Sequence, residues 1–427
     1  MIDRNTPPQV ALIKDFTFVK AKTFDLNAPH KGFYIDATDQ EIVKVELILK
    51  AGYREQKKPM QAAAVNKLLL EGTKHRSAME IASLFEGKGA FLDTDIHADY
   101  ASLVLHCLSR HLDELFPLVL EMLNDASFPE EEWLDFKQNK LNQFSIKQEK
   151  VSFLTKNAFA VNFFGKAHAY NNSLSKSDFD ALSREDLLEF YEQHYVGNPI
   201  TVLLSGKVKS RELDLIKQHL GGWKKPKAKN NNEGLNFNST FQKGLELNIE
   251  KEGASQSAIR MGLPMPQKGS ADFPKVFLAN TLLGGFFGSR LMSNLREDKG
   301  YTYGIGSGIV NLEMAAYWFL TTEVGVEHTA NSLKEIKVEM QKLNETEVEE
   351  EELQLVKSYL QGTLMRNFDG PFQAMDRFKS IHLLGLDYSY YENFVQQIKT
   401  IEAKELLAIY RQYFKFENTL KIIAGKK

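Results

Sequence analysis

The sequence predicts an α+β protein built from two homologous domains. The main observation is an internal repeat: residues 182–207, LSREDLLEFYEQHYVGNPITVLLSGK, align without a gap with residues 401–426, IEAKELLAIYRQYFKFENTLKIIAGK. Each copy reads as an amphipathic helix followed by a short apolar strand, and such repetition is typical of a duplicated fold. Identical residues recur at an offset of 219, with Leu187, Leu188, Tyr191, Gln193, Gly206 and Lys207 repeated as Leu406, Leu407, Tyr410, Gln412, Gly425 and Lys426.

A polar segment separates the two copies. Residues 224–234, KKPKAKNNNEG, contain one proline and three consecutive asparagines. Such a segment cannot bury apolar surface, so it is expected to be a solvated linker. We therefore predict a first domain over residues 1–222, a linker over 223–240 and a second domain over 241–427.

Strand and helix patterns are mixed within each half. Residues 42–50 predict a half-buried strand, because Val43, Val45, Leu47 and Leu49 alternate with Lys44, Glu46 and Lys50. Residues 60–71, MQAAAVNKLLLE, are rich in alanine and leucine without a helix breaker and predict a helix. A second strand is expected within 97–108 and a second helix over 112–124. This order favours, in each domain, a largely antiparallel sheet with helices packed on one face.

Length and composition restrict the class of protein. A chain of 427 residues is too long for one ordinary core, and 43% hydrophobic with 26% charged residues is typical of a soluble globular protein. The net charge of −3 gives no basis for binding nucleic acid, and no apolar run approaches the roughly 18 residues of a membrane span. Cys107 is the only cysteine, and MIDRNTPPQV lacks the features of a signal peptide, so we expect a cytoplasmic protein without disulfides.

Three motifs resemble the insulinase/pitrilysin family of metallopeptidases, the inverted zincins with the signature H-x-x-E-H. They are AGYREQ at 51–56, EGKGAFLDTDIHADYASLVL at 86–105 and LLGGFFGSRLMSNLREDKGYTYGIGSG at 282–308. The resemblance covers nearly the whole chain. It implies two α/β-roll domains per chain and, in small family members, two chains that face each other around a chamber.

The resemblance places the family's zinc site on residues that do not bind zinc. Its three signature positions fall on Ala63, Asn66 and Lys67, and its later acidic pair falls on Asn142 and Gln143. In the signature, two histidines bind the metal and the glutamate activates water. Alanine has no ligand atom, the amides are poor bases, and a lysine ammonium repels a dication. We therefore expect no metal in this chain.

The resemblance also places the family's Arg/Tyr pair on Arg296 and Tyr303, within LREDKGYTYGIG. In active complexes this pair comes from the domain opposite the zinc, binds the substrate backbone and helps to polarise the scissile carbonyl. Guanidinium and phenol suit this role because both are rigid hydrogen-bond donors. Strand alternation would place Tyr301 on the same face as Tyr303, so the sequence leaves open which phenol reaches the cavity.

The resemblance also bears on the strand that follows the zinc helix. In active chains of the family, the substrate adds to the edge of this strand as a further β-strand. The Asn-Ala of those chains is replaced here by Asp93-Thr94. This substitution indicates that the first domain does not grip a substrate in the same way.

These assignments imply a non-catalytic subunit, inactive alone, that pairs with a homologous H-x-x-E-H subunit in a peptide-cleaving heterodimer. Zinc would be held by the partner, and Arg296 and Tyr303 would complete the site. Two alternatives remain open: a scaffold without a catalytic contribution, and a peptide-binding protein that forms a homodimer. An autonomous zinc peptidase is disfavoured by the missing ligands. We expect neither nucleic acid nor a membrane as a partner.

Overall fold

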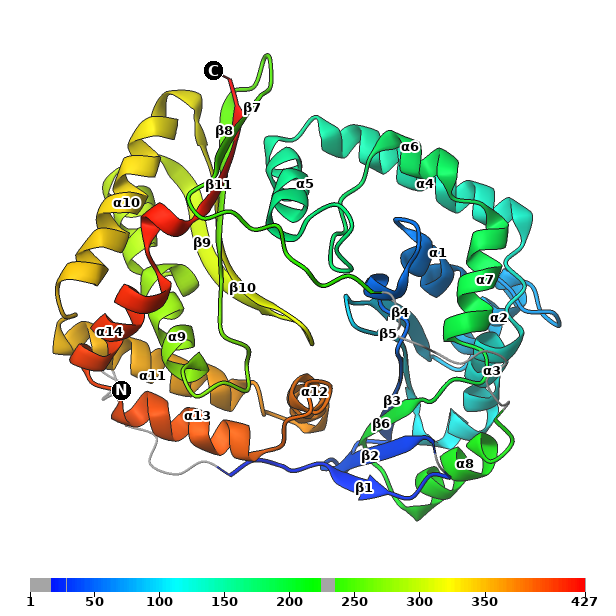
Figure 1. Cartoon of the computed structure of the whole chain (residues 1–427). Coiled ribbons are helices and arrows are strands. Elements are labelled where there is room, and N and C mark those ends of the chain that lie inside the picture. Colours follow the sequence, from blue (N-terminus) through cyan, green and yellow to red (C-terminus); the bar gives the residue numbers. More distant parts are fainter. Residues whose placement is uncertain (1–16, 28, 224–234, 427) are drawn as a thin grey trace, which may run out of the picture.

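A computed structural model describes residues 17–27, 29–223 and 235–426. It contains two β-sheets with helices on their outer sides (Figure 1). The polar segment 224–234, which carries most of the predicted linker, lies outside the described residues. Within the described chain, no helix has both the length and the apolar character needed to cross a bilayer.

The first sheet has six strands in the order β1-β2-β6-β3-β5-β4. All neighbours are antiparallel except β2 and β6. The strands are β1 (Lys22–Phe24), β2 (Lys31–Asp36), β3 (Ile42–Leu49), β4 (Phe91–Ile96), β5 (Ala101–Leu108) and β6 (Thr201–Gly206).

The second sheet repeats this order without the first strand: β7-β11-β8-β10-β9. Its one parallel pair, β7 with β11, corresponds to β2 with β6. The strands are β7 (Glu246–Glu250), β8 (Gln256–Pro264), β9 (Thr302–Asn311), β10 (Ala316–Gly325) and β11 (Leu420–Gly425). The duplicated fold predicted from the repeat is confirmed, because β6 and β11 are its two apolar strands.

Each sheet packs one face against helices of its own half. In the first half, the inward residues of β3 are at most 1% exposed and share one apolar core with the helices. These helices are α1 (Gln61–Leu68), α2 (Ala78–Glu86), α3 (Leu112–Asp125), α4 (Glu130–Gln148), α6 (Lys176–Ala181), α7 (Arg184–His194) and α8 (Ser210–Leu220). In the second half they are α9 (Phe273–Asn280), α10 (Thr329–Glu345), α11 (Glu350–Arg366), α13 (Ser389–Thr400) and α14 (Ala403–Tyr413).

Two helices cover the sheet of the opposite half. Helix α5 (Val151–Phe164) packs on β8 and β11, where Phe159 and Phe163 contact the cluster that contains Leu420 and Ile422. Helix α12 (Pro371–His382) packs in turn on β2 and β6 (Figure 1). The remaining helices of each half therefore lie on one face of their own sheet, as predicted, and the opposite half supplies one helix to the second face.

The packing of α12 on the first sheet shows that the prediction of a half-buried β3 is wrong. Lys44 and Glu46 lie on the face away from the first core, yet they are only 8% and 1% exposed. Helix α12 covers them and provides opposite charges: Lys44 Nζ lies 2.8 Å from Asp376, and Lys379 Nζ lies 2.9 Å from Glu46. Local alternation predicted solvent on this face because the covering helix comes from far along the chain.

Candidate functional site

The first signature positions lie on α1, which packs between β4 and α7. Ala63 is half-buried, whereas Asn66 is 2% exposed and its amide is fully engaged. Asn66 Nδ2 donates to the Asp95 carbonyl at 2.8 Å, and the Tyr195 hydroxyl donates to Asn66 Oδ1 at 3.1 Å. Asn66 thus joins α1 to β4 and cannot turn toward a metal without breaking two buried hydrogen bonds.

Lys67 and Gln143 line one cavity of about 350 Å³ between α1 and α4. Lys140 lies there too, and burial together with the neighbouring lysines lowers the pKa of its ammonium. Asn142 does not line this cavity, since it is exposed and accepts a hydrogen bond from Gln138 on the same helix at 2.9 Å. The fold brings Lys67 and Gln143 together, but these side chains do not fit zinc. Among the described residues, no cluster of three or more histidine, cysteine or carboxylate side chains could hold a metal ion.

Arg296 lies in a π-helical turn, Met292–Asp298, that contacts β9. Its guanidinium carbon stands 4.8 Å from the centre of the Phe287 ring, and Phe287 is itself 61% exposed. No ion pair links Arg296 to another described residue. Arg290 differs, because it forms a bidentate ion pair with Glu352. Its Nε and Nη2 lie 2.8 and 2.6 Å from the two carboxylate oxygens, so Arg290 has a structural role.

Tyr303 is 94% exposed and lies in a β-bulge of the edge strand β9. Thr302 pairs with Val324 and Ile305 with Thr322, so two residues of β9 oppose the single residue Glu323 of β10. Two threonine hydroxyls stabilise the bulge: Thr302 Oγ1 donates to the Glu323 carbonyl at 2.7 Å, and Thr322 Oγ1 donates to the Gly304 carbonyl at 3.0 Å. A bulge redirects the side chain that it carries, and such features concentrate near functional sites.

The two tyrosines have different surroundings. Tyr301 precedes β9, is partly buried and stacks on His328 with ring centres 4.6 Å apart. Tyr301 thus lies just outside the strand on which the predicted alternation depends, and it is less exposed than Tyr303. Only Tyr303 presents a phenol that is almost entirely accessible.

Comparison with known proteins shows which domain and which structures the chain resembles. Residues 181–360 match the model of the peptidase M16 inactive domain. Two crystal structures resemble nearly the whole chain. That of a peptidase M16 inactive domain from Pseudomonas fluorescens has a TM-score of 0.84 and 21% sequence identity, and the match covers 96% of this chain and 98% of that one. That of a protease from Helicobacter pylori has a TM-score of 0.86 and 18% identity, with coverage of 96% and 100%. The match to the peptidase M16 inactive domain is thus confined to residues 181–360, whereas the similarity of fold extends over nearly the whole chain.

Two relatives show how varied the family names are. An M16 relative from Helicobacter pylori named non-peptidase homolog YmxG is 24% identical over 84% of this chain and 83% of its own length. A Bacillus subtilis relative named uncharacterized zinc protease YmxG is 18% identical over 84% and 86%. Each match covers more than four fifths of both proteins, so the similarity extends to both halves of this chain.

The edge strand β4 of this M16 fold is blocked locally. The backbone N–H of Thr94 donates to Oδ1 of Asp93 at 2.8 Å. An added strand would need free backbone donors at such an edge. The Asp93 carboxylate occupies one of them.

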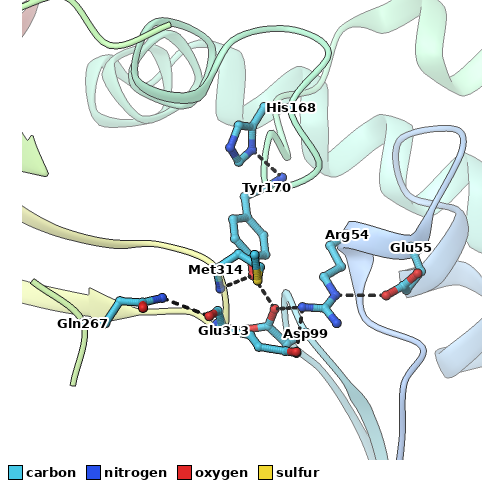
Figure 2. Close-up of polar contacts among 8 residues, drawn as sticks. All are labelled: Arg54, Glu55, Asp99, His168, Tyr170, Gln267, Glu313 and Met314. Carbon is cyan, nitrogen blue, oxygen red and sulfur yellow. Dashed lines mark hydrogen bonds and ion pairs between the residues drawn. The ribbon is translucent and has the colours of Figure 1, made fainter. Parts of the chain in front are cut away.

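One polar site that sequence reasoning missed joins the two halves (Figure 2). The Arg54 guanidinium, whose side chain is 1% exposed, lies 2.9 Å from Glu55, 2.8 Å from Asp99 and 2.8 Å from Glu313. Tyr170 donates its hydroxyl to Asp99 at 2.6 Å, and burial together with this carboxylate raises the pKa of the phenol. The motif AGYREQ contains Arg54, but the partners of this arginine are scattered along the chain, so no local sequence pattern indicated the junction.

Proposed function

We propose that this chain is the non-catalytic subunit of a heterodimeric zinc metallopeptidase. Zinc and the general base would come from a homologous H-x-x-E-H subunit, and Arg296 and Tyr303 would bind the peptide at a composite site. The observation that carries the proposal is the 94% exposure of Tyr303 in a bulge of an edge strand. A large aromatic side chain held outward on a rigid element is suited to contact a partner or a substrate.

The donor groups of the pair support this role. Neither Arg296 nor Tyr303 forms an ion pair or a hydrogen bond through its side chain with another described residue, so both retain their donors for a ligand. Guanidinium and phenol can stabilise charge on a carbonyl oxygen, and two such donors act most strongly where water is excluded. A facing subunit would provide that exclusion.

The first half supports placing the zinc in the partner. Asn66 is bound within the fold, and Lys67 and Gln143 supply an ammonium and an amide where the family has a histidine and a carboxylate. We also propose a cytoplasmic location, which fits the single buried cysteine, Cys107.

The test is to isolate the complex that this chain forms in its native extract and to measure cleavage of a fluorogenic peptide library with and without a zinc chelator. We expect chelator-sensitive cleavage by the complex and none by this chain alone. Arg296→Ala and Tyr303→Phe should each lower turnover by about 10²-fold, a magnitude typical of lost transition-state donors, without loss of zinc from the complex.

Tyr301→Phe is the matched control, because its ring stacks on His328 and its hydroxyl makes no hydrogen bond with a described residue. It should leave turnover within about twofold of the unmodified complex. Unchanged turnover in both Arg296→Ala and Tyr303→Phe, with the complex intact, would instead favour the scaffold. A homodimer without a homologous partner would favour the peptide-binding protein.

A further inference from the structure

A cavity of about 420 Å³ lies between the two halves. It is bounded by the β4–β5 turn of the first half and by β9, α9, α11, α12 and α13 of the second. A volume of this order fits a small organic molecule. Neither Arg296, Tyr303 nor any signature position lines it, so it is separate from the site proposed above.

One part of the cavity wall is apolar and aromatic. Phe273 and Phe394 are 3% and 7% exposed, and Phe277 packs against the same core. Leu360 completes this part of the wall. A hydrocarbon chain or ring would therefore gain favourable burial here.

The other part of the wall carries two cations without counter-charges. Lys268 Nζ donates to Ser380 Oγ at 3.1 Å and lies 5.1 Å from the centre of the Tyr390 ring, but no described carboxylate forms an ion pair with it. Arg377 has no ion pair with a described residue either, and its Nε is buried without a hydrogen-bond acceptor. The acidic residue of the wall, Asp99, already binds Arg54 and Tyr170.

These two cations destabilise each other. Burial, followed by the charge of Arg377, lowers the pKa of the Lys268 ammonium to about 8. Both side chains are half-buried, and a charge that is partly removed from water without a counter-charge is costly. Perturbed titratable groups inside a cleft are therefore candidates for binding a ligand.

We propose that this cavity binds a small carboxylate with an apolar body, its carboxylate between Lys268 and Arg377 and its body among Phe273, Phe277 and Phe394. A single carboxylate can accept hydrogen bonds from both cations. The aromatic remainder of the wall disfavours a strongly hydrated inorganic anion.

The test is isothermal titration calorimetry on the full chain at pH 7. Octanoate and N-acetylphenylalanine represent two sources of this chemistry, a fatty acid and a peptide end, and their neutral amides are the controls. We expect at least one acid to bind, with its amide at least about tenfold weaker, and the acid that binds identifies the source.

Lys268→Met and Arg377→Met should each weaken binding of that acid about tenfold while the variants remain folded by thermal unfolding. Lys334→Met, at an exposed position of α10 outside the cavity, should leave binding unchanged. Equal binding of acid and amide, tight binding of inorganic phosphate, or full binding by both cavity variants would overturn the proposal. Failure of both acids to bind at millimolar concentration would overturn it as well. Because these measurements need neither partner nor peptidase activity, they do not depend on the function proposed above.

Discussion

At the scale of single residues, asparagine has the same structural role in both halves. Asn66 on α1 binds the Asp95 carbonyl and the Tyr195 hydroxyl. On α9, the corresponding helix of the second half, Asn280 Oδ1 accepts from Ser307 at 2.8 Å and from Trp318 at 2.9 Å. The position that the family resemblance assigns to a general base therefore holds its helix against β4 and the end of α7.

Asn66→Asp tests this role. The substitution keeps the shape of the side chain but replaces the donor to the Asp95 carbonyl with an acceptor in a buried site. We expect the free energy of unfolding to fall by about 2–4 kcal/mol at pH 7, measured by urea denaturation. Asn142→Asp, at an exposed position, is the control and should change it by less than about 0.5 kcal/mol. Equal effects of the two substitutions would show that the amide of Asn66 is not structural.

Lys268 gives a residue-scale prediction for stability and pH. Its pKa in the folded chain is about 8 against an ordinary 10.5, so the unfolded chain binds more protons between these two values. The stability of the unmodified chain should therefore rise as pH increases from about 8 to 10.5. Lys268→Met, which removes the buried charge, should stabilise the chain by roughly 2 kcal/mol at pH 7 and lose this advantage by pH 10.5. Thermal unfolding across this range measures both; an advantage that does not depend on pH would contradict the assignment.

At the scale of elements, the bulge in β9 is the feature that sets Tyr303 apart. Thr322 is 3% exposed, and its hydroxyl donates to the Gly304 carbonyl inside the bulge. Thr322→Val keeps the shape and removes that donor, so we expect a loss of about 1–2 kcal/mol in the free energy of unfolding. If the chain forms the proposed peptidase complex, the substitution should also reduce the turnover of that complex, since the orientation of Tyr303 depends on the bulge.

Thr321→Val is the matched control on the same strand, because the Thr321 hydroxyl makes no hydrogen bond with a described residue. Its free energy of unfolding should change by less than about 0.5 kcal/mol. If Thr322→Val reduced stability but left turnover unchanged, the bulge would be structural only.

The elements themselves follow closely from local sequence pattern. The helix expected over 112–124 is α3, Leu112–Asp125, and the repeated helix–strand units are α7 with β6 and α14 with β11. Local periodicity is sufficient here because each element buries one face against its own half. It fails at Lys44 and Glu46, where a helix from the other half covers the strand.

At the scale of the whole molecule, contacts between the halves could not be predicted from the sequence. Arg54 and Glu313 are far apart in the chain, yet they meet at the junction between the halves (Figure 2). The candidate binding residues likewise include some that the sequence could indicate and some that it could not. The family resemblance was sufficient to name Arg296 and Tyr303, whereas the cavity with Lys268 and Arg377 exists only after the halves have docked.

The exchanged helices predict that the two halves fold only together. Residues 1–222 contain α5, whose aromatic residues would lose Leu420 and Ile422, and the same fragment would expose Ile35, Ile48 and Leu203, which α12 covers. Exposed apolar surface of this kind drives association or unfolding. Fragments 1–222 and 241–427 should therefore aggregate or lack cooperative unfolding when expressed singly. On co-expression they should elute as a one-to-one complex with cooperative unfolding. If each fragment alone were monodisperse and unfolded cooperatively, the exchanged helices would contribute little, and the junction at Arg54 would be a contact between independent domains.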